Sequence, residues 1–144
     1  MRRIRLIVGI GALAVGVFAT LALASIKHFQ GHVDQGGKIA FDAKVRGGTP
    51  RKAGAFNVGP VRVSCDEGNT PLSARMDHFV RVRDRKFHTA IIGGIAGVGG
   101  RVSISGRFNR KGNKAHGEFK AVKVDFGGRS NCTTNGPRDW TAEK

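Results

Sequence analysis

Apolar and polar residues alternate with a period of two in several short segments of the chain, and this pattern predicts β-strands. Ile39, Phe41, Ala43 and Val45 occupy every second position of one such segment. Alternation or enrichment in Val and Phe recurs in the segments 61–65, 80–83, 87–92, 102–105 and 119–124, which are bounded by Gly, Pro, Asn or Asp. We therefore predict an all-β fold: an antiparallel β-sandwich or barrel-like domain preceded by one N-terminal hydrophobic helix.

One β-hairpin can be identified in some detail. The tetrapeptides SGRF (105–108) and HGEF (116–119) lie on either side of the glycine-containing connection 109–113. Two strand-like segments separated by five residues with a glycine predict a hairpin. The paired glycines would permit a close approach of the backbones or a bend in the sheet, and we expect Phe108 and Phe119 in the core.

The N-terminal segment has the pattern of an export signal. Three arginines precede Leu6–Ile26, a run of 21 residues without a charge. A helix of about 20 apolar residues can span a bilayer, and the arginines orient the following chain to the outside. The cleavage pattern Ala22-Leu23-Ala24 favours a removed signal peptide, whereas the length of the run favours an uncleaved anchor. Both alternatives place the remainder outside the cytoplasm.

The domain organisation follows from this boundary. We assign residues 1–26 to a signal peptide or transmembrane signal anchor, 27–36 to a linker and 37–144 to an extracytoplasmic β domain. With 144 residues, the chain is long enough for one domain of modest size. Its composition excludes a multidomain enzyme, a collagen-like fibre, a coiled coil and an acidic disordered tail.

The chain has two cysteines, Cys65 and Cys132, and both follow the export segment. Outside the cytoplasm an isolated pair of cysteines usually forms a disulfide. The sequence has no C-x-x-C motif for redox chemistry and no second pair for zinc. We therefore predict a disulfide between Cys65 and Cys132.

The strongest chemical property of the chain is its charge: 25 Lys and Arg against 10 acids, a formal net charge of +15. Basic residues concentrate around two predicted hairpins, and adjacent hairpins would form one cationic surface able to bind polyanions by counterion release. The alternative is that these side chains only solvate strand faces and turns. The first cluster consists of Arg75, Arg81, Arg83, Arg85 and Lys86, and the second of Arg107, Arg110, Lys111 and Lys114. All of these except Arg75 are the candidate contacts for an anionic surface.

Outside a cell, the partners that suit such a surface are anionic envelope polymers or lipid headgroups. Nucleic acid is a poorer fit, because the chain has no tyrosine and few other rings for base stacking. The Leu6–Ile26 segment adds a membrane contact if it is not removed.

No catalytic, cofactor-binding or metal-binding site is predicted, and we expect the protein not to be an enzyme. H-E-x-x-H and G-x-S-x-G motifs are absent. A small secreted hydrolase is the less favoured alternative, and it needs a cleft that gathers His78, His88 or His116 with carboxylates. The glycine-rich segment Gly93–Gly100 lacks the Lys-Ser/Thr of a phosphate-binding loop, and we interpret it as an apolar hairpin loop.

Several of these motifs together resemble a family of small exported β-rich proteins of actinobacteria. The resemblance covers about residues 31–144 and implies an all-β extracytoplasmic domain with a disulfide, but no activity. The favoured function is thus a non-enzymatic envelope or secreted protein that binds anionic surfaces, with a protein-interaction module acting through a strand edge or Gly93–Gly100 as the alternative. The motifs that carry the resemblance are Gln35-Gly36-Gly37, Val63–Gly68, Lys86-Phe87, Val102–Phe108, Ala115–Phe119, Cys132-Thr133-Thr134 and Trp140–Lys144.

Overall fold

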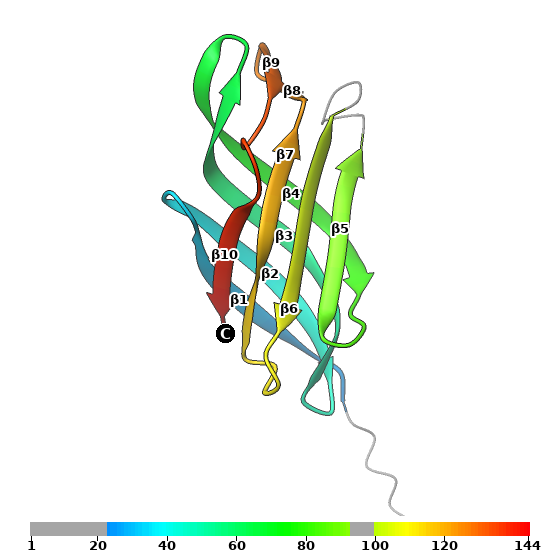
Figure 1. The fold of residues 1–144 in the computed structure, drawn as a ribbon. Helices are drawn as coiled ribbons and strands as arrows, with labels where there is room; N and C mark the ends of the chain where they lie inside the picture. The colour runs from blue at the N-terminus through cyan, green and yellow to red at the C-terminus, as the bar shows by residue number, and fades with distance from the viewer. Residues whose placement is uncertain (1–22, 93–99) are drawn as a thin grey trace, which may run out of the picture.

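The computed structural model of the protein describes residues 23–92 and 100–144 and shows an all-β fold, as predicted (Figure 1). Within these residues there are ten strands and no helix. The strands are β1 (Ser25–Val33), β2 (Gly37–Arg46), β3 (Thr49–Cys65), β4 (Gly68–Arg81), β5 (Lys86–Ile92), β6 (Arg101–Phe108), β7 (Lys114–Val122), β8 (Val124–Phe126), β9 (Arg129–Cys132) and β10 (Arg138–Glu143).

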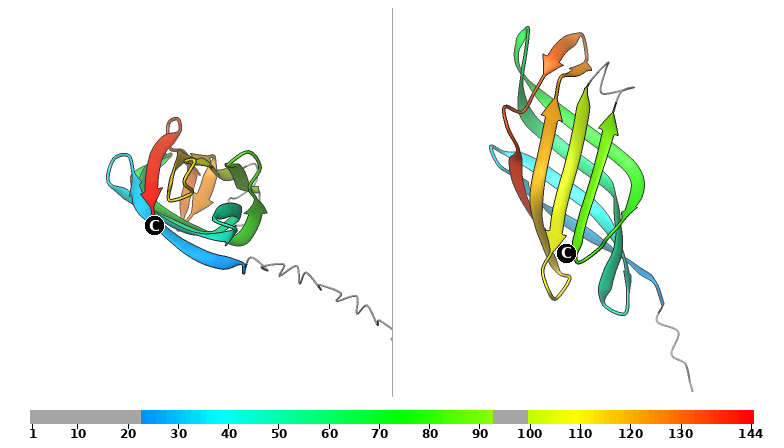
Figure 2. Two further views of the ribbon diagram at one scale, coloured as in Figure 1. Left: turned by 90° about the horizontal axis from the view of Figure 1, so that it is seen from below. Right: turned by 45° about the vertical axis from the view of Figure 1, so that its right-hand side comes forward.

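Eight strands form one antiparallel sheet in the order β4-β3-β2-β1-β10-β7-β6-β5, and β8 and β9 form a separate hairpin. The large sheet curls on itself, so that its two outermost strands approach each other in a nearly closed barrel (Figures 1 and 2). Across this seam the ring nitrogen Nε2 of His78 lies 2.6 Å from the hydroxyl oxygen of Thr89. At one end of the seam, a tight turn joins β4 to β5, and within this turn Arg83 and Lys86 exchange two backbone hydrogen bonds.

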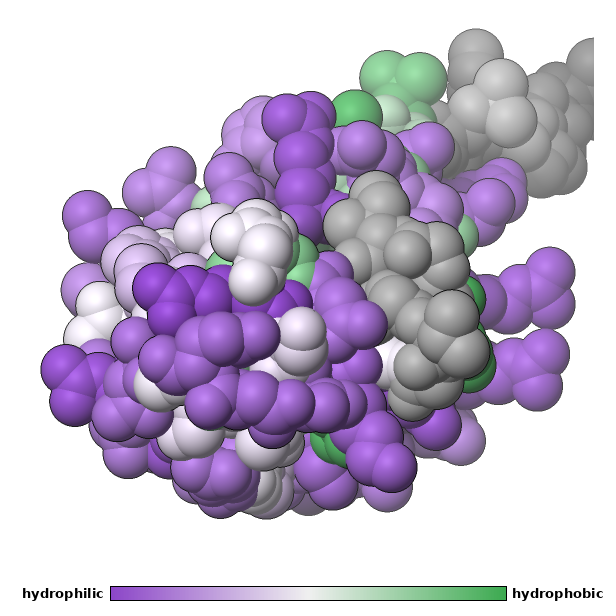
Figure 3. Space-filling view, turned by 90° about the horizontal axis from the view of Figure 1, so that it is seen from above, coloured by the Kyte–Doolittle hydropathy of each residue, from purple (hydrophilic) through white to green (hydrophobic). Residues whose placement is uncertain are grey.

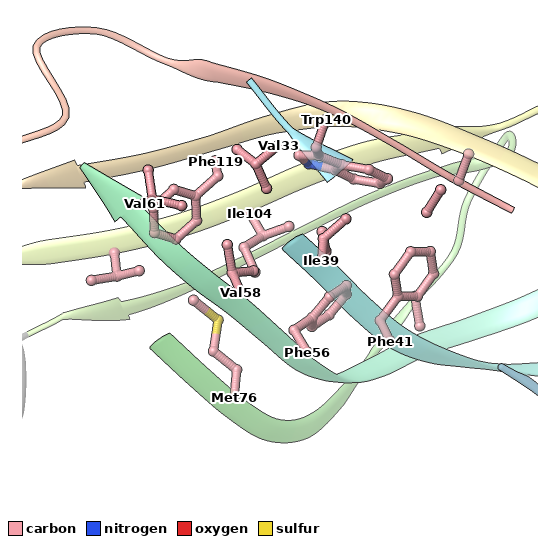
Figure 4. Close-up of a cluster of buried hydrophobic side chains, with 14 of the residues drawn as sticks. Val33, Ile39, Phe41, Phe56, Val58, Val61, Met76, Ile104, Phe119 and Trp140 are labelled. Carbon is pink, nitrogen blue, oxygen red and sulfur yellow. The ribbon is translucent and has the colours of Figure 1, made fainter. Parts of the chain in front are cut away.

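Alternate residues of the strands point inward and fill the barrel with aromatic rings. Phe29 stacks on Phe41 with ring centroids 4.9 Å apart, and Trp140 meets Phe41 edge-on at 5.7 Å. Each such pair contributes about 0.5–1.5 kcal/mol beyond the burial of its area. The rings of this cluster belong to Phe29, Phe41, Phe56, Phe87, Phe108 and Trp140. Further along the barrel, aliphatic side chains and Met76 continue the core (Figure 4).

The predicted hairpin of residues 105–119 is confirmed, with Gly106 directly opposite Gly117. On the neighbouring strands, Gly117 lies directly opposite Trp140 of β10, and Gly106 lies directly opposite Phe87 of β5. A Cβ atom on Gly106 would lie 2.6 Å from ring atoms of both Trp140 and Phe87. Because the two glycines have no side chains, the indole of Trp140 can lie against the inner face of the sheet at Gly106 and approach the ring of Phe87. The backbones also approach closely here, as the sequence indicated, because a Cβ on Gly117 would overlap the carbonyl oxygen of Ser105.

The predicted disulfide between Cys65 and Cys132 is confirmed, and it joins β3 to β9 at one end of the barrel. Next to it, Ser64 and Thr133 exchange two backbone hydrogen bonds of 2.8 and 2.9 Å. The carboxylate of Glu67 accepts a 3.0 Å hydrogen bond from the backbone N–H of Ser130. The β8–β9 hairpin is thereby held against the β3–β4 turn, and we call this the disulfide end.

The boundary of the domain differs from the prediction. Residues 27–36 were assigned to a linker, whereas Ser25–Val33 form β1, which pairs with β2 along its whole length. β1 also pairs with β10 over its last four residues, so it is a central strand that connects the two halves of the sheet.

Two predicted features lie outside the described residues: most of the 1–26 export segment, including its hydrophobic helix, and positions 93–99 of the Gly93–Gly100 loop. In the described part of the chain, no helix has the length and hydropathy to cross a membrane.

Candidate functional site

The two ends of the barrel differ sharply in charge. The end opposite the disulfide carries the β2–β3, β4–β5 and β6–β7 turns, the start of β1 and the last residue, Lys144 (Figures 1 and 2). The segments 44–52, 81–86 and 107–114 at this end contain twelve Lys and Arg and one acid, Asp84. At the disulfide end, the segments 62–70 and 123–132 contain three bases and three acids. We call the first of these the cationic end.

The three turns of the cationic end are in contact with one another. The backbone N–H of Phe108 donates a 2.9 Å hydrogen bond to the carbonyl of Arg85, and the N–H of Val82 donates one of 2.9 Å to the carbonyl of Arg51. The backbone N–H of Lys144 donates to the carbonyl of Asn113 at 3.2 Å. These bonds hold the basic segments at fixed positions relative to one another.

Five basic side chains lie in two aligned groups on the outer face of the barrel at this end, and we call them together the basic row: Lys44, Lys52, Arg81, Lys86 and Arg107. On one half of the sheet, Lys44 of β2 faces Lys52 of β3, which faces Arg81 of β4. On the other half, Lys86 of β5 faces Arg107 of β6. The bridge between Arg83 and Lys86 at the β4–β5 turn connects the two halves.

The basic row has no anionic partner within the described residues. The ion pairs found there are His28–Asp42, Arg75–Asp77 and Lys114–Glu143, and none includes a row residue. Directly opposed side chains on antiparallel strands have Cβ atoms about 5 Å apart, and like charges at that distance destabilise the sheet. One contact offsets part of this repulsion, because the ammonium of Lys44 lies 4.4 Å from the centre of the Phe79 ring.

Four of the bases at this end surround a shallow hollow of about 740 Å³. Lys44, Arg46, Arg51 and Lys52 line it, and Ala24, which immediately precedes β1, lines it as well. Guanidinium and ammonium groups are the side chains that bind phosphate oxygens most strongly. The hollow is therefore suited to an anionic group.

The structure brings most of the sequence-predicted candidates together. Arg81, Lys86 and Arg107 belong to the basic row, and the two predicted hairpins are adjacent, because β5 pairs with β6. The remaining candidates lie on the adjoining turns or strand ends: Arg83, Arg85, Arg110, Lys111 and Lys114. Lys114 differs from the others, since its ammonium is 3.3 Å from the carboxylate of Glu143.

Arg75, which the sequence placed in the first cluster, is separated from the basic row. Its guanidinium donates a 2.7 Å hydrogen bond to the carboxylate of Asp77, and this bond raises the pKa of Arg75. Because the charge of Arg75 is already paired with Asp77, we expect its guanidinium to attract an external anion less strongly than an unpaired base does.

The β2–β3 hairpin contributes four bases that were not among the predicted candidates: Lys44, Arg46, Arg51 and Lys52. A signal for them was present: basic residues flank the Gly47-Gly48 turn between two strand-like segments, as they flank the other two turns. The alignment of Lys44 with Lys52 and Arg81 depends on strand register, which the alternation of residues alone does not fix.

A second hollow, a groove of about 880 Å³, lies on the outer face where β1, β10 and β7 adjoin. His32, Thr141 and His116 face one another across these strands, and Glu143 also lines the groove. The carboxylate of Glu143 is bound to Lys114, and among the described residues neither histidine is hydrogen-bonded to an acid. The other two histidines considered for a hydrolase lie elsewhere: the ring of His78 is hydrogen-bonded to Thr89 and that of His88 to Arg101.

Comparisons of the chain with protein-family models, with curated proteins and with solved structures found no match.

Proposed function

We propose that this protein is a non-enzymatic domain that attaches to anionic surfaces outside the cytoplasm through its cationic end. The observation that carries the proposal is the basic row, where three bases in register on β2–β4 and two in register on β5–β6 lack a carboxylate partner in the described structure. Neighbouring like charges raise the local potential and attract polyanions, whose binding releases counterions. A polyanion would thus relieve a repulsion that exists in the free protein.

The extracytoplasmic location in this proposal is supported by the Cys65–Cys132 disulfide, since disulfides persist in oxidising compartments. The arginine-flanked apolar run at the N-terminus supports the same location. The disulfide end, where acids and bases balance, presents mostly hydrophilic residues to the viewer in Figure 3.

The alternative of partner binding through a strand edge has weaker support. The two outermost strands of the sheet, β4 and β5, approach each other, and His78 and Thr89 are hydrogen-bonded across the seam. An added strand would have to break that contact.

The test is the salt dependence of binding to soluble polyphosphate by the full chain in a neutral detergent. Binding is expected to weaken steeply with added salt, with a log–log slope that reports the number of phosphates neutralised. The triple variant Lys44→Gln/Lys52→Gln/Arg81→Gln is expected to lower the slope by about two to three. The matched control Lys38→Gln/Lys120→Gln/Lys123→Gln removes the same charge elsewhere and is expected to leave most of the slope intact. Equal losses in both variants, or retention that does not change with salt, would contradict the proposal.

A further inference from the structure

We propose that the anionic surface is a phospholipid bilayer, on which the barrel stands with its cationic end against the headgroups and its disulfide end pointing away. This inference rests on the proposed function and narrows it from polyanions in general to lipid. Two observations that are independent of the charge carry it: the place where the chain enters the barrel, and the location of exposed apolar side chains.

The chain enters the barrel at the cationic end. Ser25, the first residue of β1, lies opposite Val45, one residue before the end of β2. Ala24 lies in the wall of the basic hollow beside Lys44 and Lys52. The apolar residues 6–24 therefore join the barrel at the hollow itself, and the last two residues of the run, Ser25 and Ile26, begin β1. A bilayer that holds this run is brought next to the basic side chains, which makes their contact with headgroups effectively intramolecular.

Exposed apolar side chains accompany the bases at this end. Large exposed hydrophobic residues in the described structure are Leu23, Ile26 and Ile92, with exposed fractions of 87%, 52% and 71%. Leu23 and Ile26 lie at the chain entry, and Ile26 is directly opposite Lys44. Ile92 is the last residue of β5 and lies away from the cationic end. The outer face of β1–β4 thus presents an isoleucine followed by Lys44, Lys52 and Arg81 in one line.

This combination distinguishes a bilayer from a soluble polymer. Surfaces that bind membranes combine apolar side chains, which enter the acyl boundary, with Lys and Arg, which contact anionic headgroups. A polyphosphate or acidic polysaccharide chain has no apolar layer to receive Leu23 and Ile26. The hollow lined by Lys44, Arg46, Arg51 and Lys52 then receives a lipid phosphate while Ile26 lies beside it.

The experiment uses the full chain in lipid nanodiscs, which leave both membrane faces accessible. Lysines are acylated with a membrane-impermeant reagent in discs of phosphatidylglycerol with phosphatidylcholine, and in discs of phosphatidylcholine alone. We expect Lys52, Lys86 and Lys111 to react several-fold more slowly in the anionic discs than in the neutral ones. Lys38 and Lys123, which lie away from the cationic end, are expected to react equally in both. Equal reactivity of all five lysines in the two kinds of disc overturns the bilayer proposal.

A pair of variants tests the apolar contribution. Ile26→Thr keeps a β-branched residue at the strand position but is expected to weaken the protection of Lys52 in anionic discs. Ile92→Thr, the matched control at the end of β5 that is far from the cationic end, is expected to leave protection unchanged. Neither substitution removes charge, so both variants are expected to bind soluble polyphosphate as the unchanged protein does. If Ile26→Thr has no more effect than Ile92→Thr, the apolar contact is overturned.

The two proposals fail in distinguishable ways. Salt-dependent polyphosphate binding without lysine protection in anionic discs would leave the proposed function standing and identify a polymer as the partner, against the bilayer. Absence of both would contradict the proposed function as well.

Discussion

The indole ring of Trp140 lies against Gly106, a residue that is two strands away in the sheet. Trp140 reaches it because Gly117, the residue between them, also lacks a side chain. The ring thus connects β10 to Phe87 of β5, with ring centroids 6.1 Å apart. A glycine pair that looks like a flexible point in the sequence is in fact a site of dense packing.

Gly106→Ala is therefore expected to destabilise the protein by roughly 1–3 kcal/mol, because the added methyl group forces two large rings to move. Urea unfolding followed by circular dichroism measures the change. Ser103→Ala, on the outer face of the same strand, serves as the control and is expected to change stability by less than about 0.5 kcal/mol. Similar stabilities for the two variants would show that the indole does not depend on this space.

Arg85 lies in a strained turn, and we interpret its positive charge as part of the proposed anion-binding surface. Asp84 and Arg85 are the two residues enclosed by the Arg83–Lys86 bridge in the β4–β5 turn, and their φ values are 49° and 66°. A side chain in this left-handed region costs on the order of 1 kcal/mol, a cost that glycine avoids. Arg85→Gly is thus expected to raise the melting temperature while weakening polyphosphate binding.

Asp84→Gly provides the comparison for this turn. It relieves similar strain and is expected to raise the melting temperature too, but it removes an acid and so strengthens polyphosphate binding. If both glycine variants changed binding in the same direction, the turn would affect binding through its shape rather than its charge.

The repulsion within the basic row has a measurable effect on stability. Lys52 faces Lys44 on one side and Arg81 on the other. Lys52→Gln removes both like-charge pairs and is expected to raise the free energy of unfolding by roughly 0.2–1 kcal/mol at low ionic strength. The gain should vanish in about 1 M salt, where charges are screened within about 3 Å. Lys123→Gln, outside the row, should give no such salt-dependent gain in the same thermal melts.

The disulfide is expected to contribute substantially to stability. Cys65 and Cys132 are 67 positions apart, and on the chain-entropy model closing a loop of this length restricts the unfolded chain by about 4 kcal/mol. The variant Cys65→Ser/Cys132→Ser should therefore unfold at a markedly lower urea concentration than the oxidised protein. Reducing the unchanged protein should reproduce most of that shift, and a failure to do so would assign the loss to the serines rather than to the cross-link.

Glu67 gives the disulfide end a dependence on acidity. The backbone N–H of Ser130 donates to its carboxylate, and this bond, with one from its own backbone, lowers the pKa of Glu67 below its usual value of 4.5. A lowered pKa in the folded state favours folding above the usual value, and this contribution disappears as the pH falls through the lowered pKa. Glu67→Gln should be less stable than the unchanged protein at pH 7, and the difference in melting temperature should diminish toward pH 3. If the difference in melting temperature between the two proteins stayed constant across this pH range, the charge of the Glu67 carboxylate would not be its cause.

The strands and hairpins with strong local signals could be predicted from the sequence, and those defined by pairing could not. The hairpin of residues 105–119 has a short glycine-containing turn and similar tetrapeptides on either side, so its presence and its paired glycines could be predicted from local sequence. β1 was missed because its inward positions, Phe29, Gly31 and Val33, include a glycine, which weakens the alternation. In addition, the uncharged run Leu6–Ile26 overlaps the first two residues of β1, so the predicted domain boundary was placed after the start of that strand.

The candidate site was half predictable for the same reason. Clusters such as Arg81–Lys86 are visible because their bases are close in sequence. Lys44 and Lys52 are each an ordinary outward residue of a strand, and only their register with Arg81 makes them part of one row. Sequence reasoning detects charge density along the chain, but not charge alignment between strands.

The ring-filled interior determines how this barrel can recognise anything. Because aromatic side chains occupy the space in the described barrel that an enclosed ligand would need, the anion binding proposed above would use the outer wall. Contacts on such a wall are individually weak and add together, so occupancy should rise steeply once negative groups are dense enough to engage several bases at once. The barrel would then report how crowded a surface is with charge, rather than the identity of any single molecule on it.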